Sequence, residues 1–173
     1  MCGIAGYLDF NAPRREPLHN RIAVLKAMRD SMAHRGPDGK GHWVSADGRV
    51  GLAHRRLAIV DLSEAAGQPM ANEDGGVRVT FNGEIYNHMA LRRELEQGGH
   101  RFCTDHADTE VIVHGYEEWG AQGLSERLDG MFAFAVWDAG RNLLTLVRDR
   151  VGIKPVYFTR VSGSFLFASE IKA

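Results

Sequence analysis

Seven consecutive apolar residues, Met131–Trp137, constrain the fold of this chain more than any other stretch. The run is far shorter than the roughly 20 apolar residues that a membrane-spanning helix needs. It has no polar residue at alternate positions, so neither face of a strand formed here would meet water. A strand of this kind lies in a sheet that is covered on both sides. The sequence therefore predicts a sheet with a packed layer on each face.

Short strand patterns and a few helix patterns surround this run. Strands are predicted at 3–8, 42–44, 50–54, 57–60, 77–81, 143–147, 155–160 and 164–169, and helices at 18–33, 88–97 and 109–119. Asp47-Gly48 predicts a hairpin turn, and Asn82-Gly83 is expected to end the strand before it. Residues 1–173 are therefore predicted to form one α+β domain of mostly antiparallel strands. Two stacked sheets between helical layers would bury Met131–Trp137 on both faces.

Charge and cysteine content exclude several classes of protein. Lys and Arg total 21 against 22 Asp and Glu, and no block of five like charges occurs, whereas nucleic-acid-binding domains carry basic patches. The N-terminus has no basic segment and reaches Asp9 early, unlike a signal peptide. We therefore expect a cytoplasmic protein with no nucleic-acid or membrane partner. In that compartment Cys2 and Cys103 would stay reduced and form no disulfide.

Cys2 is a candidate nucleophile because of its position next to the initiator Met1. Initiator Met is normally removed before a small residue, which would leave a thiol and a free α-amine on Cys2. The α-amine has a pKa of about 7.7–8.0, so part of it is neutral at cellular pH. It can then act as a general base toward its own thiol. The alternative is that Cys2 is an incidental small residue.

Three further segments carry polar groups that acyl transfer would use. Asn82-Gly83 could supply a side-chain amide and an unhindered backbone N–H to an oxyanion, or could be a plain hairpin turn. An Arg of His54–Arg56 could hold a carboxylate with two N–H groups, or could lie on a solvated strand edge. Asp108 could take a ligand ammonium or cap the helix that follows. With Cys2, these groups would suit a free amino acid with a side-chain acyl group.

Seven motifs follow one another along nearly the whole chain. They are Met1–Gly6, His34–Gly39, His54–Asp61, Asn82–Asn87, Asp108–Ile112, Gly130–Ala135 and Arg148–Pro155. In this order they resemble the motifs of class II glutamine amidotransferases, and above all those of the N-terminal glutaminase domain of asparagine synthetases. The chain departs from the usual pattern between Phe102 and Asp108, where that family more often has a shorter segment ending in Ser-Asp.

The resemblance implies the N-terminal-nucleophile hydrolase fold, with four layers in the order αββα. It also implies that Cys2 attacks the side-chain amide of L-glutamine, that ammonia leaves, and that water hydrolyses the thioester to glutamate. Asn82 and Gly83 match the oxyanion hole, and Arg56, rather than Arg55, matches the clamp on the α-carboxylate. The resemblance further assigns to the glutamine pocket the residues Leu57, Ala58, Ile59 and Val60, and near the substrate amine Glu84 and Asp108.

The resemblance also implies a partner. Asparagine synthetases carry a C-terminal synthetase domain with a Ser-Gly-Gly-x-Asp-Ser type ATP loop, which these residues lack. No cofactor is therefore expected in this chain, and ATP and Mg²⁺ belong to the synthetase domain. That domain would use the ammonia to amidate aspartate or a related carboxylate. The chain ends directly after the strand pattern at 164–169, which favours a piece of a longer protein. Whether the chain forms a homodimer stays open.

Other interpretations compete with this one. Cys103, His106 and Asp108 could suggest a metal site, but the four-ligand spacing of a structural zinc site does not occur. No metal site is therefore expected, and Cys103 is interpreted as a small buried residue. The glycines at 36, 39 and 41 match neither the dinucleotide fingerprint nor a P-loop. A non-catalytic scaffold, a glutamine-binding module and a glutaminase domain that serves a different acceptor remain as alternatives.

Overall fold

A computed structural model of the chain describes residues 1–11, 18–58 and 63–173. Its strands are β1 (Gly3–Asp9), β2 (Gly39–Val44), β3 (Val50–Arg56), β4 (Met70–Ala71), β5 (Val77–Ile85), β6 (Gly130–Asp138), β7 (Leu143–Arg148), β8 (Tyr157–Val161) and β9 (Ser164–Ala168). Its helices are α1 (Leu18–Ser31), α2 (His88–Gln97) and α3 (Asp108–Arg127), with a short 3₁₀ turn at Glu64–Ala66.

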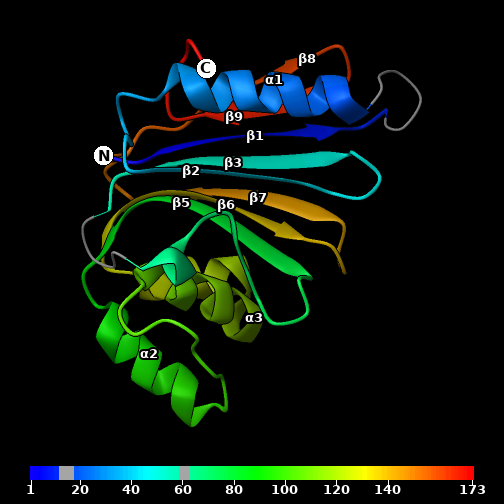
Figure 1. The fold of residues 1–173 in the computed structure, drawn as a ribbon. Helices are drawn as coiled ribbons and strands as arrows, with labels where there is room; N and C mark the ends of the chain where they lie inside the picture. The colour runs from blue at the N-terminus through cyan, green and yellow to red at the C-terminus, as the bar shows by residue number, and fades with distance from the viewer. Residues whose placement is uncertain (12–17, 59–62) are drawn as a thin grey trace.

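These elements stack in four layers (Figure 1). The helix α1 covers a sheet of strand order β2-β3-β1-β9-β8, which lies on a second sheet of order β4-β5-β6-β7. The helices α3 and α2 cover the outer face of the second sheet, with α2 outermost. Every strand pairing in these two sheets is antiparallel. The predicted αββα arrangement of mostly antiparallel sheets is confirmed.

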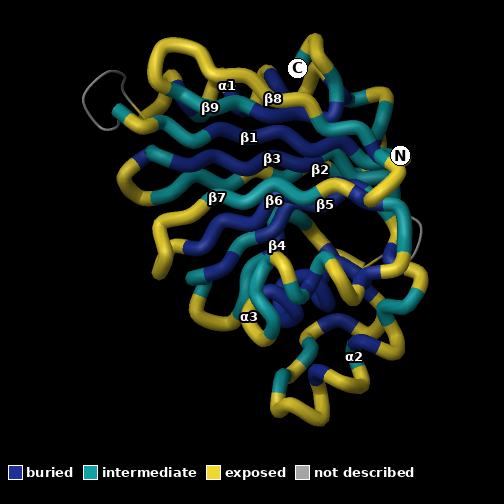
Figure 2. Tube along the Cα trace, turned by 180° about the vertical axis from the view of Figure 1, so that it is seen from behind, coloured by how far each residue is buried: buried dark blue, intermediate teal, exposed yellow. Residues whose placement is uncertain are grey.

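The strand β6 contains the apolar run, and both of its faces are buried (Figure 2). The side chains at alternate positions from Phe132 to Val136 pack into the core beneath α2 and α3, with residues such as Ile112. Those from Ala133 to Trp137 pack into the core between the two sheets, with residues such as Leu52. Alternation of side chains across a strand thus sends one apolar run into two different cores.

The helix α1 buries a narrow apolar stripe against the outer face of the first sheet. Met28 and Met32 pack with Ala5, and Leu25 packs with Tyr7 and Ala53. The spacing of Leu25 and Met28 brings them to one side of the helix, and Met32 follows in the turn directly after it. None of the helices in the described ranges is long and apolar enough to cross a membrane.

The expectation that Asn82-Gly83 ends a strand is wrong. β5 continues through both residues to Ile85, because it pairs with β6 along its whole length, including Gly83 opposite Phe132. A Cβ atom at Gly83 would collide with the carbonyl oxygen of Met131. The glycine therefore permits close approach of two strands rather than a turn. Pairing with β6 outweighs the local turn preference of the dipeptide.

Two other predicted elements differ from the structure by more than a shift of two or three residues at an end. The helix expected at 109–119 is the first part of α3, which Gly120 interrupts with φ 67° and ψ 178° before helical structure resumes to Arg127. The strand expected at 57–60 is absent at Leu57 and Ala58, while 59–60 lie outside the described residues. The backbone N–H of Ala58 instead donates to Asp38 Oδ2, in the loop before β2, at 2.9 Å.

Candidate functional site

A pocket of about 200 Å³ lies where both sheets approach the first turn of α3. This is smaller than the roughly 300–1,000 Å³ of sites for drug-sized ligands, so it suits a molecule about as large as an amino acid. The predicted site residues among its lining are Cys2, Arg56, Leu57, Ala58, Asn82, Gly83, Glu84 and Asp108. Ile59 and Val60, also predicted for this site, lie outside the described residues.

Cys2 enters the pocket directly before β1 begins. The Leu57 N–H donates to its Sγ at 3.4 Å, and Sγ lies 3.7 Å from the Leu57 carbonyl oxygen. Burial raises the pKa of the Cys2 thiol, and the Leu57 N–H only partly opposes this. Since the thiolate is the reactive form, this sulfur needs a base to take its proton when it attacks a substrate.

The backbone around Cys2 is fixed by distant parts of the chain. Arg35 Nε donates to the Cys2 carbonyl oxygen at 2.9 Å, and Arg35 also pairs with Glu170 at 3.1 Å. The Ile4 N–H donates to Ser169 Oγ at 3.0 Å. The loop after α1 and the segment after β9 therefore hold the residue in place, which keeps the sulfur at a defined position in the pocket.

The two arginines at the end of β3 point in different directions, because side chains alternate along a strand. Arg55 reaches the α1 side of the sheet and pairs with Asp30 at 3.4 Å. Arg56 lines the pocket, and its guanidinium donates to the Ser63 carbonyl oxygen at 2.8 Å. Of these two arginines only Arg56 lines the pocket.

His54 ties the two sheets together beside the pocket. The ring is fully buried, and its Nε2 lies 3.1 Å from the Phe81 carbonyl oxygen on β5. On the same strands, Thr80 Oγ1 donates to the Ala53 carbonyl oxygen at 3.1 Å. Both bonds join β3 to β5 one or two residues before Asn82. They set the position of Asn82 relative to Cys2.

His54 should make the fold sensitive to acid. Burial lowers the pKa of His54 to about 3, whereas an unfolded histidine has a pKa of about 6.5. Below about pH 6.5 the unfolded chain binds a proton on this histidine, whereas the folded chain keeps the ring neutral. The free energy of unfolding therefore decreases as the pH falls from about 6.5 toward 3, by up to about 1.4 kcal/mol per pH unit. Urea unfolding at pH 7 and pH 5 should show that His54→Gln loses less unfolding free energy between these two pH values than the wild type does. Equal losses in the two proteins would contradict the assignment of this acid sensitivity to His54.

Asn82 presents an unpaired donor to the pocket. The residue is only 1% exposed, and its Nδ2 has no hydrogen-bond partner among the residues that the structure describes. Buried side-chain polar atoms are nearly always paired, so an exception at a pocket wall points to a ligand. An amide NH₂ held in this way can stabilise a developing oxyanion without reorganisation.

Asp108 does not cap α3. The N-cap residue is Ala107, without a side-chain cap bond, whereas Asp108 Oδ2 accepts the Ile85 N–H at 3.1 Å. Burial raises the pKa of the Asp108 carboxyl, so its charged form would gain from a cationic partner. Glu84 also lines the pocket and is exposed. The two carboxyl groups provide a place for a ligand ammonium.

The sequence interpretation gave no site role to several other residues that line the pocket, among them Gln68 and Lys154. Gln68 accepts the Phe81 N–H at 2.6 Å and donates to Thr109 Oγ1 at 3.0 Å, so it braces β5 against α3. Lys154 is 6% exposed, and its backbone N–H donates to Asp149 Oδ2 at 3.0 Å. Lys154 belongs to the motif Arg148–Pro155, to which the sequence analysis assigned no function. No local pattern marks Gln68, because only the tertiary fold brings it to the pocket.

The residues weighed for a metal site do not form one. Cys103 is exposed, so its expected burial is wrong, while Asp108 bonds to β5 as described above. Both cysteines are free, as the sequence predicted. Within residues 1–11, 18–58 and 63–173, a group of three side chains able to hold a metal ion occurs outside this pocket, on α3 and the loop before it.

Known proteins resemble the chain over its full length. A family of glutamine amidotransferase domains matches residues 1–173. Asparagine synthetases [glutamine-hydrolyzing] 2 and 3 of Bacillus subtilis are each 45% identical over the whole chain, which spans 22% and 27% of their lengths. Among solved structures, glutamine phosphoribosylpyrophosphate amidotransferase from B. subtilis has a TM-score of 0.77 at 20% identity, over 98% of this chain and 42% of that one. At this identity the last likeness concerns the fold alone.

Proposed function

The chain belongs to the family of glutamine amidotransferase domains, and from this premise we propose that it hydrolyses the side-chain amide of L-glutamine with Cys2 as the nucleophile. The observation that carries the proposal is one pocket lined by both the Cys2 thiol and the unpaired amide of Asn82, within the described residues. A nucleophile and an oxyanion donor that converge on one small pocket are the requirements of acyl transfer.

The reaction follows from these groups. Removal of Met1 frees the α-amine of Cys2, which takes the thiol proton while Sγ bonds to the amide carbon of glutamine. The carbonyl electron pair moves to oxygen, where the Asn82 amide and the Gly83 N–H stabilise it. As the pair returns, the C–N bond breaks and the nitrogen leaves with the proton as ammonia. Water then hydrolyses the thioester, which releases glutamate and restores the thiol.

The charged groups of the pocket explain selection of a free amino acid. Arg56 can hold the α-carboxylate of glutamine, because a guanidinium offers two parallel N–H donors. Asp108 and Glu84 can accept hydrogen bonds from the α-ammonium. These contacts fix the substrate by its backbone groups and direct its side chain toward Cys2.

Replacing Arg56 by alanine should raise KM for glutamine about 10–100-fold and change kcat much less. The carboxylate is bound equally in the ground state and the transition state, so its loss weakens binding rather than chemistry. Arg55→Ala is the matched control, because Arg55 pairs with Asp30 on the opposite face of the sheet. Steady-state kinetics of both variants measures this. An unchanged KM for Arg56→Ala would place the clamp elsewhere.

The proposed base can be tested at the N-terminus. Intact mass should show that Met1 is absent from active protein, and an uncleaved N-terminal extension should lower glutamate release at least about 100-fold. The extension turns the α-amine into an amide, which cannot accept the thiol proton. Removal of the extension by a protease that leaves Cys2 first should restore activity. Full activity of the extended chain would reject the α-amine as the base.

We further propose that the ammonia serves a synthetase domain in a longer protein. The asparagine synthetases reported above are the support, since this chain spans only 22–27% of their lengths. ATP-dependent amidation of aspartate, or of a related carboxylate, is the reaction that would consume the ammonia. Asparagine formation from glutamine, aspartate and ATP by the longer protein tests this, and ammonia release without asparagine would point to a different acceptor.

A further inference from the structure

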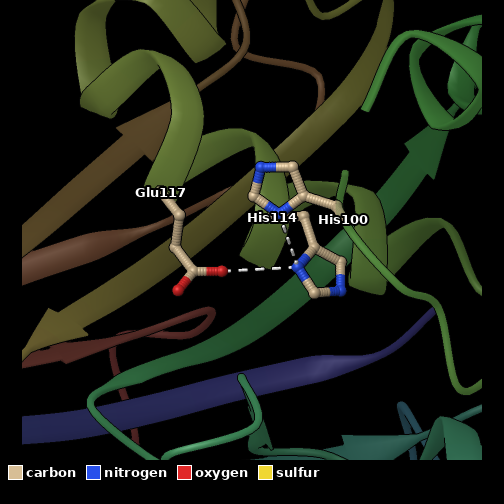
Figure 3. A group of neighbouring side chains, drawn as sticks. All are labelled: His100, His114 and Glu117. Carbon is tan, nitrogen blue, oxygen red and sulfur yellow. Dashed lines mark hydrogen bonds and ion pairs between the residues drawn. The ribbon is translucent and has the colours of Figure 1, made fainter. Parts of the chain in front are cut away.

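A second group of titratable side chains consists of His100, His114 and Glu117 (Figure 3), and none of the three lines the proposed glutamine pocket. His114 and Glu117 stand on one side of α3, three residues apart, and His100 approaches them from the loop between α2 and α3. The left-handed backbone of Gly99, with φ 99°, turns the chain there. The sequence predicted no metal site, because the four-ligand spacing of a structural zinc site does not occur, and its patterns did not connect these three residues.

Two of the three separations between these side chains match the edge of a tetrahedral zinc site. The Nδ1 atoms of His100 and His114 are 3.3 Å apart, and His114 Nδ1 lies 3.3 Å from Glu117 Oε2. Zinc binds such ligands at about 2.0–2.2 Å, and a tetrahedron of that size has edges of about 3.3 Å. All three ligand atoms lie within 4.8 Å of one another. Two ring nitrogens and one carboxylate oxygen can therefore share one ion.

Each of these side chains also has a polar partner at its other end. His100 Nε2 lies within hydrogen-bond distance of Glu118 Oε2, at 3.2 Å, whereas His114 Nε2 lies 3.8 Å from Glu110 Oε1, an ion-pair distance only. Asn72 Nδ2 donates to Glu117 Oε1 at 2.7 Å. Metal-binding histidines usually direct their second nitrogen to a carboxylate, which fixes the tautomer and the ring orientation. Here both histidines would bind through Nδ1 and keep a proton on Nε2.

We propose that His100, His114 and Glu117 bind one Zn²⁺ ion, with water at the fourth position. Two neutral imidazoles and one carboxylate leave a single positive charge, which the nearby carboxylates of Glu110 and Glu118 more than offset. The ion would fasten the loop between α2 and α3 to the body of α3. Glu110 already holds the same loop, since Oε1 accepts the Cys103 N–H and Oε2 accepts the Thr104 N–H. The ion would lie about 9 Å along the helix from Asp108, outside the residues that line the proposed glutamine pocket.

Zinc binding by the 173-residue chain tests this proposal directly. The Cys2→Ala background removes the thiol of the glutamine pocket as a competing ligand. Chelator-treated protein should take up one Zn²⁺ from a chromogenic chelator, and its melting temperature should rise with Zn²⁺. Co²⁺ in its place should give the intense visible absorption of a tetrahedral site. No uptake in competition with the chelator would overturn the proposal and leave the three side chains as a hydrogen-bonded group.

Variants locate the ion without unfolding the chain. Glu117 is exposed and His100 is partly exposed, so Glu117→Gln and His100→Ala should fold and should each weaken zinc affinity at least about 100-fold. Glu118→Gln, which only orients His100, should weaken it about 10–100-fold. His106→Ala is the control, because His106 is exposed on the same loop outside the group. Unchanged affinity in both ligand variants would overturn the assignment.

Discussion

Cys2→Ala should abolish glutamate release from glutamine, by a factor on the order of 10⁴ or more. The variant loses the atom that would form the thioester, and no other thiol lies in the described lining of the pocket. Glutamine should still bind, because Arg56, Glu84 and Asp108 are unchanged. A coupled glutamate assay measures the loss, and isothermal titration with glutamine measures the retained binding.

Cys103→Ala is the matched control for this experiment. Cys103 is exposed and lies outside the pocket that contains Cys2, so its loss should leave glutamate release unchanged. A thiol-directed glutamine analogue should add one label to the wild type and to Cys103→Ala, and none to Cys2→Ala. Turnover by Cys2→Ala would refute the mechanism, whereas a wild type that binds glutamine without turnover would favour a glutamine-binding module.

Asn82→Ala should lower kcat for glutamine about 10²–10³-fold, with little change in KM. A single oxyanion donor contributes about 3–4 kcal/mol to transition-state stabilisation. The ground-state carbonyl gains much less from this donor, so substrate binding is largely retained. The reason for choosing Asn82 is its buried Nδ2, which has no partner within the part of the chain that the structure describes. Steady-state kinetics separates the two effects.

The conservative variant Asn82→Asp sharpens this test. Aspartate keeps the shape of the side chain but offers only acceptors when ionised, so its loss of kcat should equal or exceed that of Asn82→Ala. The melting temperature of Asn82→Ala should stay within a few degrees of the wild type, because Nδ2 bonds to no described residue, whereas the buried carboxylate of Asn82→Asp should lower it. A large fall in melting temperature with unchanged kcat would show that Asn82 is structural.

Much of the fold could be predicted from local patterns. Apolar and polar residues alternate at Val77–Phe81, which predicts a strand with one buried face. The unbroken apolar run at Met131–Trp137 predicts a strand that is buried on both faces. The errors fall where non-local pairing competes with local preference. Asn82-Gly83 has the composition of a turn, yet β6 extends β5 through it. Gly120 lies within a helical segment, and its positive φ could not be predicted from the sequence alone.

The candidate site was predicted less completely. The roles proposed for Cys2, Arg56, Asn82 and Asp108 stay predictions, although the structure brings all four to one pocket. Gln68 was missed because its bonds to β5 and α3 join segments that are distant in the sequence. His100, His114 and Glu117 were not connected for the same reason. Each of these groups becomes recognisable only when its neighbours are known.

The sequence by itself determined the two-faced burial of the strand at Met131–Trp137, the antiparallel character of the sheets and the family. These properties depend on periodicity and on ordered motifs, which a linear chain displays directly. Only the tertiary structure decided the direction of Arg56 relative to Arg55, the unpaired state of the Asn82 amide among described residues and the approach of His100 to α3. Direction, pairing and proximity depend on distances between remote segments, which packing of the layers sets.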